Sequence, residues 1–205
     1  EMLKCVLNDM VTEAGATLLL HSWGARAIRK GNQVKGVIFE SKSGRQAVLG
    51  KIVIDTTGDG DIFASAGVPF ESKLDPKIRS SHLALTFRLA NIDLEKYYAF
   101  KESNPQKYAE LMQELGKQGG FTMFINTTHK GVIWVNNNIP GLDPLNVADL
   151  SWLEVNGRNR IRLTQRFLKE NMPGFEECFV MDTASQIGVR SSRRLIGQHV
   201  LTAKE

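Results

Sequence analysis

The feature that most constrains the fold is a short apolar run that breaks into a turn rich in glycine and aspartate. Residues 52–54 are Ile-Val-Ile, a pattern typical of a strand buried on both faces. Thr-Thr-Gly-Asp-Gly-Asp follows at 56–61, and its two glycines permit positive φ or close approach to a ligand. Residues 62–67 then predict a short helix, with Asp59 or Asp61 as its N-cap. In open α/β sheets, a buried strand ending in such a turn is a typical ligand site.

The carboxylates of this turn restrict the chemistry of its ligand. Asp59 and Asp61 disfavour a bare phosphate, because an anion gains nothing beside two negative charges. They suit the hydroxyl groups of a ribose or ribityl chain, which donate hydrogen bonds to carboxylates. The alternative is a strand–turn–helix corner that supplies its own caps and binds no ligand.

The run from Ile52 to Glu71 resembles the second flavin-contacting motif of FAD-dependent oxidoreductases that have a glutathione-reductase-like FAD domain. Thr56 stands where that family usually has alanine. The resemblance implies FAD as the cofactor and a small-molecule substrate that exchanges a hydride or electrons with it. The residues that it places at the cofactor are Thr57, Gly58, Asp59 and Gly60.

A second set of blocks resembles the same family in the same order. These blocks are Pro173–Glu176, Gly188–Gly197 and Val200–Thr202. The resemblance implies that Arg190 and Arg193 form a cationic substrate site and serve as the catalytic candidates. Ser191 stands where the family usually has glutamate. The alternative is that Arg190, Arg193 and Arg194 pair with carboxylates of the FAD domain.

The periodicity of apolar residues predicts an α/β (α+β) fold, and the segments below follow from it. The expected helices are 3–14, ended by Gly15, a helix or helix pair over 94–115 broken near Asn104-Pro105, and 151–172. The expected strands are 16–21, 25–29, 33–40, 46–49, 82–89, 121–125, 131–136 and 178–183. Lys30-Gly31-Asn32 is expected to form a hairpin turn. Ser151 and Glu154 have the spacing of a capping box at the start of the last helix.

These elements suggest a partial FAD/NAD(P)-binding-like domain with an antiparallel meander, followed by a mixed substrate or cap domain. The expected boundaries are 1–70 for the rear of the FAD-binding domain, 71–180 for the substrate domain and 181–205 for a return segment. No Gly-x-Gly-x-x-Gly fingerprint occurs in the sequence, although such folds use it to bind the pyrophosphate. We therefore expect the chain to be an internal fragment of a longer flavoprotein, inactive by itself.

Five basic residues crowd the helix expected at 151–172: Arg158, Arg160, Arg162, Arg166 and Lys169. One interpretation is a non-enzymatic module that binds nucleotides or nucleic acid through this face. The other is a solvated helix whose aliphatic stems cover a neighbouring element. The net charge of +4 is mild, and no interleaving of aromatic with basic residues supports base stacking, so we expect no nucleic acid partner.

The remaining side chains point to no other cofactor. The four histidines lack the spacing of metal ligands, so no metal site is expected. Cys5 and Cys178 lie far apart and are expected to be buried thiols, as in a reducing, cytoplasmic compartment. No stretch approaches the length of a membrane span. The substrate and the oligomeric state are not determined by the sequence.

Overall fold

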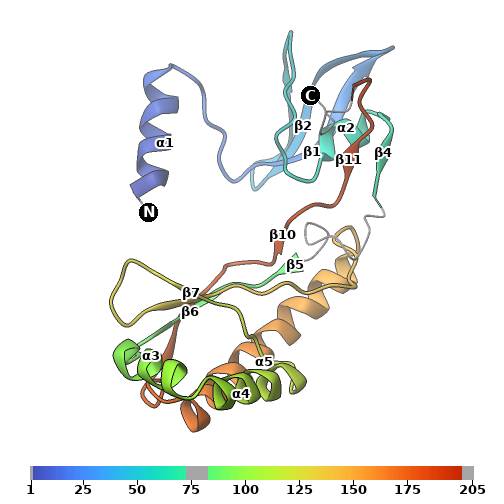
Figure 1. Cartoon of the computed structure of the whole chain (residues 1–205). Coiled ribbons are helices and arrows are strands. Elements are labelled where there is room, and N and C mark those ends of the chain that lie inside the picture. Colours follow the sequence, from blue (N-terminus) through green and yellow to red (C-terminus); the bar gives the residue numbers. More distant parts are fainter. Residues whose placement is uncertain (1, 73–82, 200–205) are drawn as a thin grey trace. The chain divides into compact units, whose positions relative to one another are not determined.

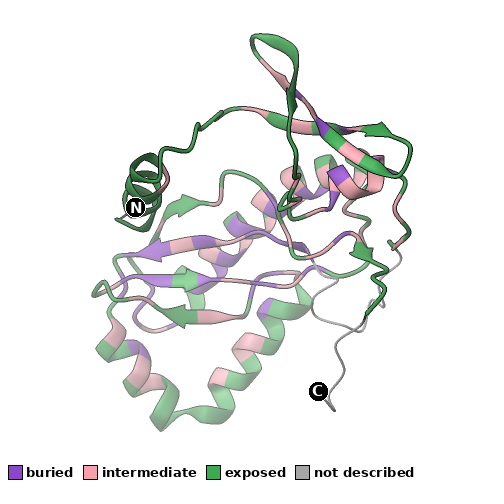
Figure 2. Cartoon of the chain, turned by 90° about the horizontal axis from the view of Figure 1, so that it is seen from above, coloured by how far each residue is buried: buried purple, intermediate pink, exposed green. Residues whose placement is uncertain are grey.

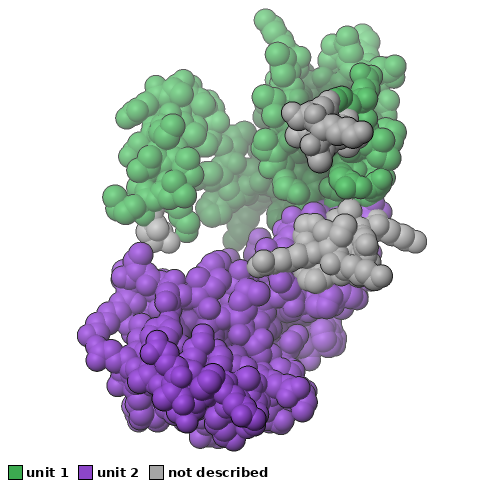
Figure 3. Space-filling model, viewed as in Figure 1, with its two compact units in different colours: residues 1–71, 193–205 green, residues 72–192 purple. Residues whose placement is uncertain are grey.

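The computed structural model describes residues 2–72 and 83–199, which divide into two compact units (Figure 3). Unit 1 consists of Glu1–Glu71 together with Arg193–Glu205. Unit 2 is the continuous segment Ser72–Ser192. Unit 1 is therefore assembled from two pieces of chain, and unit 2 is inserted between them.

The main sheet of unit 1 is an antiparallel meander of β1 (Trp23–Lys30), β2 (Gln33–Ser41) and β3 (Gly44–Leu49) (Figure 1). Gly31, with φ of 61°, forms the first turn, and Gly44, with φ of 90°, opens the third strand. These left-handed conformations suit glycine because it has no Cβ. The three predicted strands and the hairpin turn are confirmed.

The short helix α2 (Asp61–Ser65) packs on this meander. Ile62 and Ala66 form a small buried cluster with Ala27 of β1. The Ser65 Oγ accepts a hydrogen bond from the Ala27 N–H at 2.8 Å and donates to the Ile62 carbonyl at 2.9 Å. The helix expected after the glycine-rich turn is confirmed, and both apolar burial and a side-chain hydrogen bond hold it to the sheet.

Two short strands join the two pieces of chain that make unit 1. They are β4 (Phe70–Glu71) and β11 (Arg194–Leu195), which pair antiparallel. Arg194 and Glu71 are register partners, and the Arg194 Nε donates to the Glu71 carboxylate at 3.0 Å. The chain from Arg193 onward therefore belongs to unit 1, whereas residues 181–192 of the expected return segment belong to unit 2. The family-like block at 200–202 lies outside the described residues.

Two predicted strands of unit 1 are wrong. Residues 16–21 and 52–54 form no strand, and the side chains of Ile52 and Ile54 are 82% and 80% exposed. A strand buried on both faces needs neighbouring strands, and none of the described residues pairs with 52–54. Of residues 52–54, only Val53 packs against the buried cluster of Ala27, Ile62 and Ala66.

The N-terminal helix α1 (Met2–Glu13) is confirmed, with Gly15 at φ of 68° after its end. None of its residues is buried (Figure 2). Cys5 is therefore exposed, which corrects the expectation of a buried thiol. Among the described residues, no helix combines the length and apolar character that crossing a membrane requires.

Unit 2 is built on a four-stranded antiparallel sheet. Its strands, in spatial order, are β7 (Phe124–Asn126), β8 (Ile133–Val135), β6 (Phe87–Ala90) and β9 (Phe179–Thr183). A further pair consists of β5 (Leu83–Ala84) and β10 (Gly188–Val189). The helices α3 (Leu94–Ser103), α4 (Pro105–Lys117) and α5 (Val147–Asn171) lie on one face of the sheet (Figure 1). Side chains from both layers form one buried core, including Phe87, Leu115, Ile133, Leu153 and Leu168.

Most predicted elements of unit 2 are confirmed. The helix pair divides at Asn104-Pro105, because proline starts the second helix at a position where its missing N–H is harmless. The strand expected at 82–89 is instead two short strands, β5 and β6, and His82 itself lies outside the described residues.

The capping-box prediction for α5 is wrong. Asn146 is the N-cap, and its side chain accepts a hydrogen bond from the Ala148 N–H at 2.9 Å. Ser151 lies one turn inside the helix and donates to the Val147 carbonyl at 2.7 Å. Glu154 instead accepts a hydrogen bond from the Ile187 N–H at 2.7 Å. The Ser-x-x-Glu pattern therefore stabilises α5 and a following loop, not the helix start.

Candidate functional site

The glycine-rich turn that precedes α2 is held in a left-handed conformation at two positions. Gly58 and Gly60 have φ angles of 81° and 66°. A Cβ atom at Gly60 would lie 2.0 Å from the Phe63 ring, whereas a Cβ at Gly58 would meet nothing within 4 Å. A side chain at Gly60 is therefore disfavoured by both the left-handed backbone and the contact with the Phe63 ring. Gly58 faces open space, where a ligand can approach its main chain.

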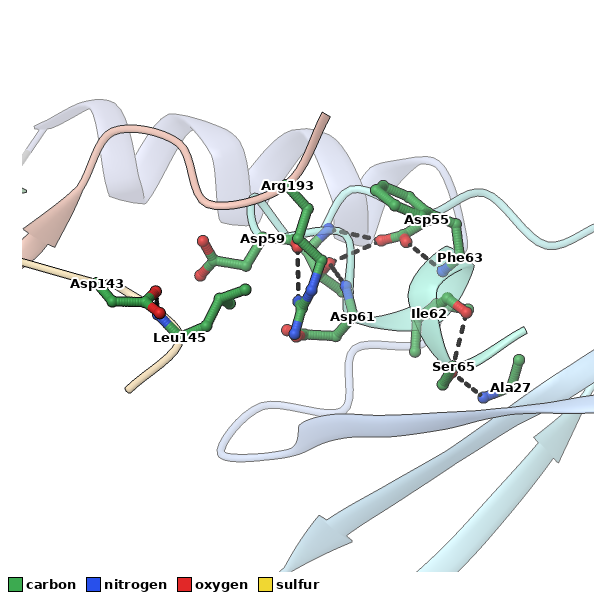
Figure 4. A network of polar contacts seen from close by, with 11 residues as sticks. Ala27, Asp55, Asp59, Asp61, Ile62, Phe63, Ser65, Asp143, Leu145 and Arg193 are labelled. Atoms are coloured by element: carbon green, nitrogen blue, oxygen red, sulfur yellow. Dashed lines mark hydrogen bonds and ion pairs between the residues drawn. The ribbon is translucent and has the colours of Figure 1, made fainter. Parts of the chain in front are cut away.

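Asp55 is the residue that organises this turn. Its Oδ1 accepts hydrogen bonds from the N–H and the hydroxyl of Thr57, at 3.0 and 2.8 Å. Its Oδ2 accepts one from the Phe63 N–H at 2.9 Å (Figure 4). Burial tends to raise the pKa of Asp55, but these hydrogen bonds outweigh it and leave the pKa below its usual range.

The capping of α2 differs from the sequence prediction. The residue before the helix is Gly60, which has no side chain, so neither Asp59 nor Asp61 is the N-cap. The Thr57 Oγ1 accepts a hydrogen bond from the Asp61 N–H at 3.0 Å, and Asp55 binds the Phe63 N–H. Asp55 is not among the site residues predicted from the sequence. Its spacing of two residues from Thr57 is the signal of an aspartate-initiated turn.

Arg193 reaches the same turn from the other end of the chain. Its Nη1 donates to the Asp59 carbonyl and to Asp61 Oδ1, both at 2.8 Å (Figure 4). Its guanidinium carbon also lies 5.7 Å from the centre of the Phe70 ring. The Arg193 side chain is 18% exposed, while that of Arg194 is 70% exposed. Arg193 thus makes the carboxylate pairing that the sequence left as an alternative, and its contact with a substrate stays untested.

The structure brings five of the six predicted site residues together in unit 1: Thr57, Gly58, Asp59, Gly60 and Arg193. Arg190 belongs to unit 2. Its Nη2 makes a long hydrogen bond of 3.4 Å to the Asn136 side chain. This hydrogen bond of Arg190 is longer than the two hydrogen bonds of Arg193, which are both 2.8 Å.

A cavity of about 480 Å³ opens beside α2 in unit 1. Its lining combines aromatic, small and charged side chains, namely Trp23, Gly24, Ala25, Asp61, Ala64, Ser65, Phe70 and Arg193. The Asp61–Arg193 ion pair therefore contributes both to the turn and to the wall of this cavity.

The basic face of α5 is used for contacts within unit 2. Arg158 forms an ion pair with Glu154, and Arg160 lies 4.7 Å over the Phe121 ring and donates to the Gly119 carbonyl. Burial lowers the pKa of Arg160. These contacts match the interpretation of arginine stems covering neighbouring elements, and they do not support a nucleic-acid-binding helix.

The chain resembles known proteins in both sequence and structure. The family model for FAD dependent oxidoreductases matches residues 1–205. This chain belongs to the FAD dependent oxidoreductase family. The family match indicates FAD as the cofactor. A search of curated proteins finds no significant match.

A solved structure similar to this chain is that of a geranylgeranyl bacteriochlorophyll reductase-like protein from Thermoplasma acidophilum. The two share 18% sequence identity with a TM-score of 0.53 over 91% of this chain. The match covers 41% of that protein's length. At this identity the similarity establishes the mixed α/β fold.

The glycine-rich turn before α2 has groups that fit a flavin nucleotide. Within the described residues, the Gly58 N–H makes no hydrogen bond, so it is available as a donor. Thr57 and Gly58 are exposed, and Asp59 is half-buried. One donor beside a carboxylate matches a ligand that carries both hydroxyl groups and phosphate oxygens. These residues therefore fit FAD better than they fit a bare anion.

Proposed function

We propose that this chain supplies part of the flavin site of an oxidoreductase with a glutathione-reductase-like FAD domain. Unit 1 would be the rear of the FAD-binding domain, and unit 2 the substrate or cap domain. One observation carries the proposal. Hydrogen bonds to Asp55 hold the turn in a conformation that leaves Gly58 open beside Asp59, in a chain of this family. When bound, FAD supplies hydride or electron transfer with a small-molecule substrate.

The residues of the chain would bind and orient the cofactor. The Gly58 N–H would donate to a cofactor oxygen, and the Asp59 carboxylate would accept hydrogen bonds from cofactor hydroxyls. The Thr57 hydroxyl is already committed to Asp55 and Asp61, so Thr57 would act by fixing the path of the turn. Arg190, which makes a long side-chain hydrogen bond of 3.4 Å to Asn136 among the described residues, is the candidate for contacting an anionic part of the substrate.

The chain of 205 residues is expected to bind FAD weakly by itself. Its sequence has no Gly-x-Gly-x-x-Gly, so the backbone donors and helix N-terminus that hold a pyrophosphate in such folds are missing from it. We expect a Kd between roughly 10 µM and 1 mM, which corresponds to about 4–7 kcal/mol of binding free energy. Titration of flavin fluorescence measures it, and tight stoichiometric binding would contradict the expectation.

Asp59→Ala is expected to weaken FAD binding roughly ten-fold. A carboxylate that accepts hydrogen bonds from cofactor hydroxyls contributes about 1.5–3 kcal/mol, and ten-fold corresponds to about 1.4 kcal/mol. The matched control is Asp9→Ala, which removes an exposed carboxylate of α1 in the same unit. The Kd for FAD and the thermal unfolding of each variant are measured together. An Asp59→Ala variant that folds and keeps the original Kd would remove Asp59 from the site.

A further inference from the structure

The charges of the flavin turn are unfavourable for an anionic cofactor. Asp55, Asp59 and Asp61 place three carboxylates within seven residues. The two phosphates of FAD add negative charge of their own, and like charges at short range repel each other. A turn with this composition needs a positive charge nearby if it is to accept a phosphorylated flavin.

Arg193 is positioned to provide that charge. Its guanidinium binds Asp61 Oδ1 at 2.8 Å, so one of the three carboxylates is neutralised within the turn itself. Arg29, by contrast, donates to the Ala66 carbonyl at the opposite end of α2. The Arg193 side chain is largely buried, so solvent screens this ion pair less than an exposed one.

Arg193 also fixes the backbone next to Asp59. The same Nη1 atom that binds Asp61 donates to the Asp59 carbonyl at 2.8 Å. This contact restrains the peptide plane between Asp59 and Gly60, and so the direction in which Asp59 leaves the turn. Arg193 is itself held, because the next residue enters β11, which pairs with β4, and the Ile196 N–H donates to the Pro69 carbonyl at 3.0 Å.

We propose that Arg193 is a positioning residue of the flavin turn and makes it selective for phosphorylated flavins by compensating the charge of Asp61. This inference rests on the proposed function, because it assumes that the turn binds FAD. It assigns Arg193 to the cofactor and leaves Arg190 as the candidate for the substrate. Without Arg193 the charge of Asp61 loses its guanidinium partner and adds to the repulsion of the cofactor's phosphates.

Arg193→Gln tests this role by comparing two flavins that differ in charge. We expect the variant to bind FAD roughly five- to ten-fold more weakly, the size expected when one charge near an anionic ligand is removed. Riboflavin, which has no phosphate, should bind with a Kd within about two-fold of the original value, because electrostatic repulsion requires charge on the ligand. Raising the salt concentration from about 0.05 to 0.5 M should restore part of the FAD affinity, since salt screens the repulsion.

Three further variants separate charge from structure. Arg194→Gln makes the same change in net charge one residue away and removes the exposed Glu71 pair; it should leave both Kd values unchanged. Arg193→Gln combined with Asp61→Asn returns the turn to its original net charge and should recover most of the FAD affinity. Arg193→Lys retains the charge and should stay close to the original Kd.

Two results would overturn the inference while leaving the proposed function intact. The first is an equal loss of FAD and riboflavin binding in Arg193→Gln, which would mark Arg193 as a purely structural residue. The second is unchanged binding of both flavins in that variant. Failure of the unaltered chain to bind FAD or riboflavin at millimolar concentration would instead overturn the proposed function, and with it the inference.

Discussion

Asp55→Ala is expected to destabilise unit 1 by about 2–3 kcal/mol, because three hydrogen bonds to a charged acceptor are lost at once. Each is worth more than a neutral bond, but the half-exposed position of Asp55 lowers the total. The Thr57 and Phe63 N–H groups lose their acceptor, and the first turn of α2 loses its cap. Amide hydrogen exchange of Thr57 and Phe63, with urea unfolding of the chain, measures the effect.

The pH dependence of this effect has a definite sign. The pKa of Asp55 is lower in the folded state than in the unfolded chain, so its ionised form stabilises the fold. That contribution is fully present above the unfolded pKa of about 4. It is lost as the pH falls through the lower folded-state pKa. The difference between the original chain and Asp55→Ala should therefore shrink below about pH 4; a difference that stays constant down to pH 2 would contradict this account.

Gly174→Ala is expected to destabilise unit 2 by about 3 kcal/mol or more, through left-handed strain plus overpacking. Gly174 has φ of 91°, and a Cβ there would lie 2.4 Å from the Asp93 carbonyl oxygen and 2.9 Å from the Tyr97 N. Both of these neighbours are main-chain atoms at the start of α3, so they cannot move aside as a flexible side chain would. The Asp93 N–H also donates to the Gly174 carbonyl at 2.9 Å, which ties this helix start to the segment after α5.

Gly119→Ala is the matched control for Gly174→Ala. Gly119 has a similar φ of 85°, but a Cβ there would meet nothing within 4 Å. It should cost about 1–2 kcal/mol, the strain of the left-handed conformation alone. Urea unfolding followed by circular dichroism, with amide exchange of α3, compares the two variants. Equal losses would show that the contact with α3 relaxes when a methyl group is added.

Elements that form contacts close in sequence were predictable. The meander β1–β2–β3 needs partners a few residues away, and Gly31 marks its first turn. The division between α3 and α4 follows from Pro105, which has no N–H to donate. In each case the sequence neighbours that carry the pattern are also the neighbours in space.

Elements that depend on distant partners were not predictable from the same patterns. The apolar run at 52–54 has the composition of a buried strand, yet Ile52 and Ile54 are exposed because no described strand pairs with them. Asn146 precedes the apolar pattern of α5 and was not recognised as its cap. Ser151 has the spacing of a capping box, but the helix begins at Val147 and Asn146 is its N-cap.

In the candidate site, too, local features were predictable and contacts with distant residues were not. The glycines at 58 and 60 were expected to permit positive φ, and both have it. The roles of the carboxylates were not foreseen, because Asp55, Asp59 and Asp61 are equivalent in a sequence pattern. Hydrogen-bond geometry separates them: Asp55 caps the helix, and Asp61 pairs with Arg193. A residue 132 positions away gives no local signal.

The two-piece construction of unit 1 has a consequence for folding during synthesis. Glu71 and its partner Arg194 are 123 residues apart, and Asp61 and Arg193 are 132 apart. At translation rates of about 5–20 residues per second, the turn waits on the order of ten seconds for its arginine to emerge. Unit 2 is synthesised entirely within that interval. The glycine-rich turn therefore reaches its final charge state last, after the inserted unit has had time to fold, so a truncated chain would lack the arginine that pairs with Asp61.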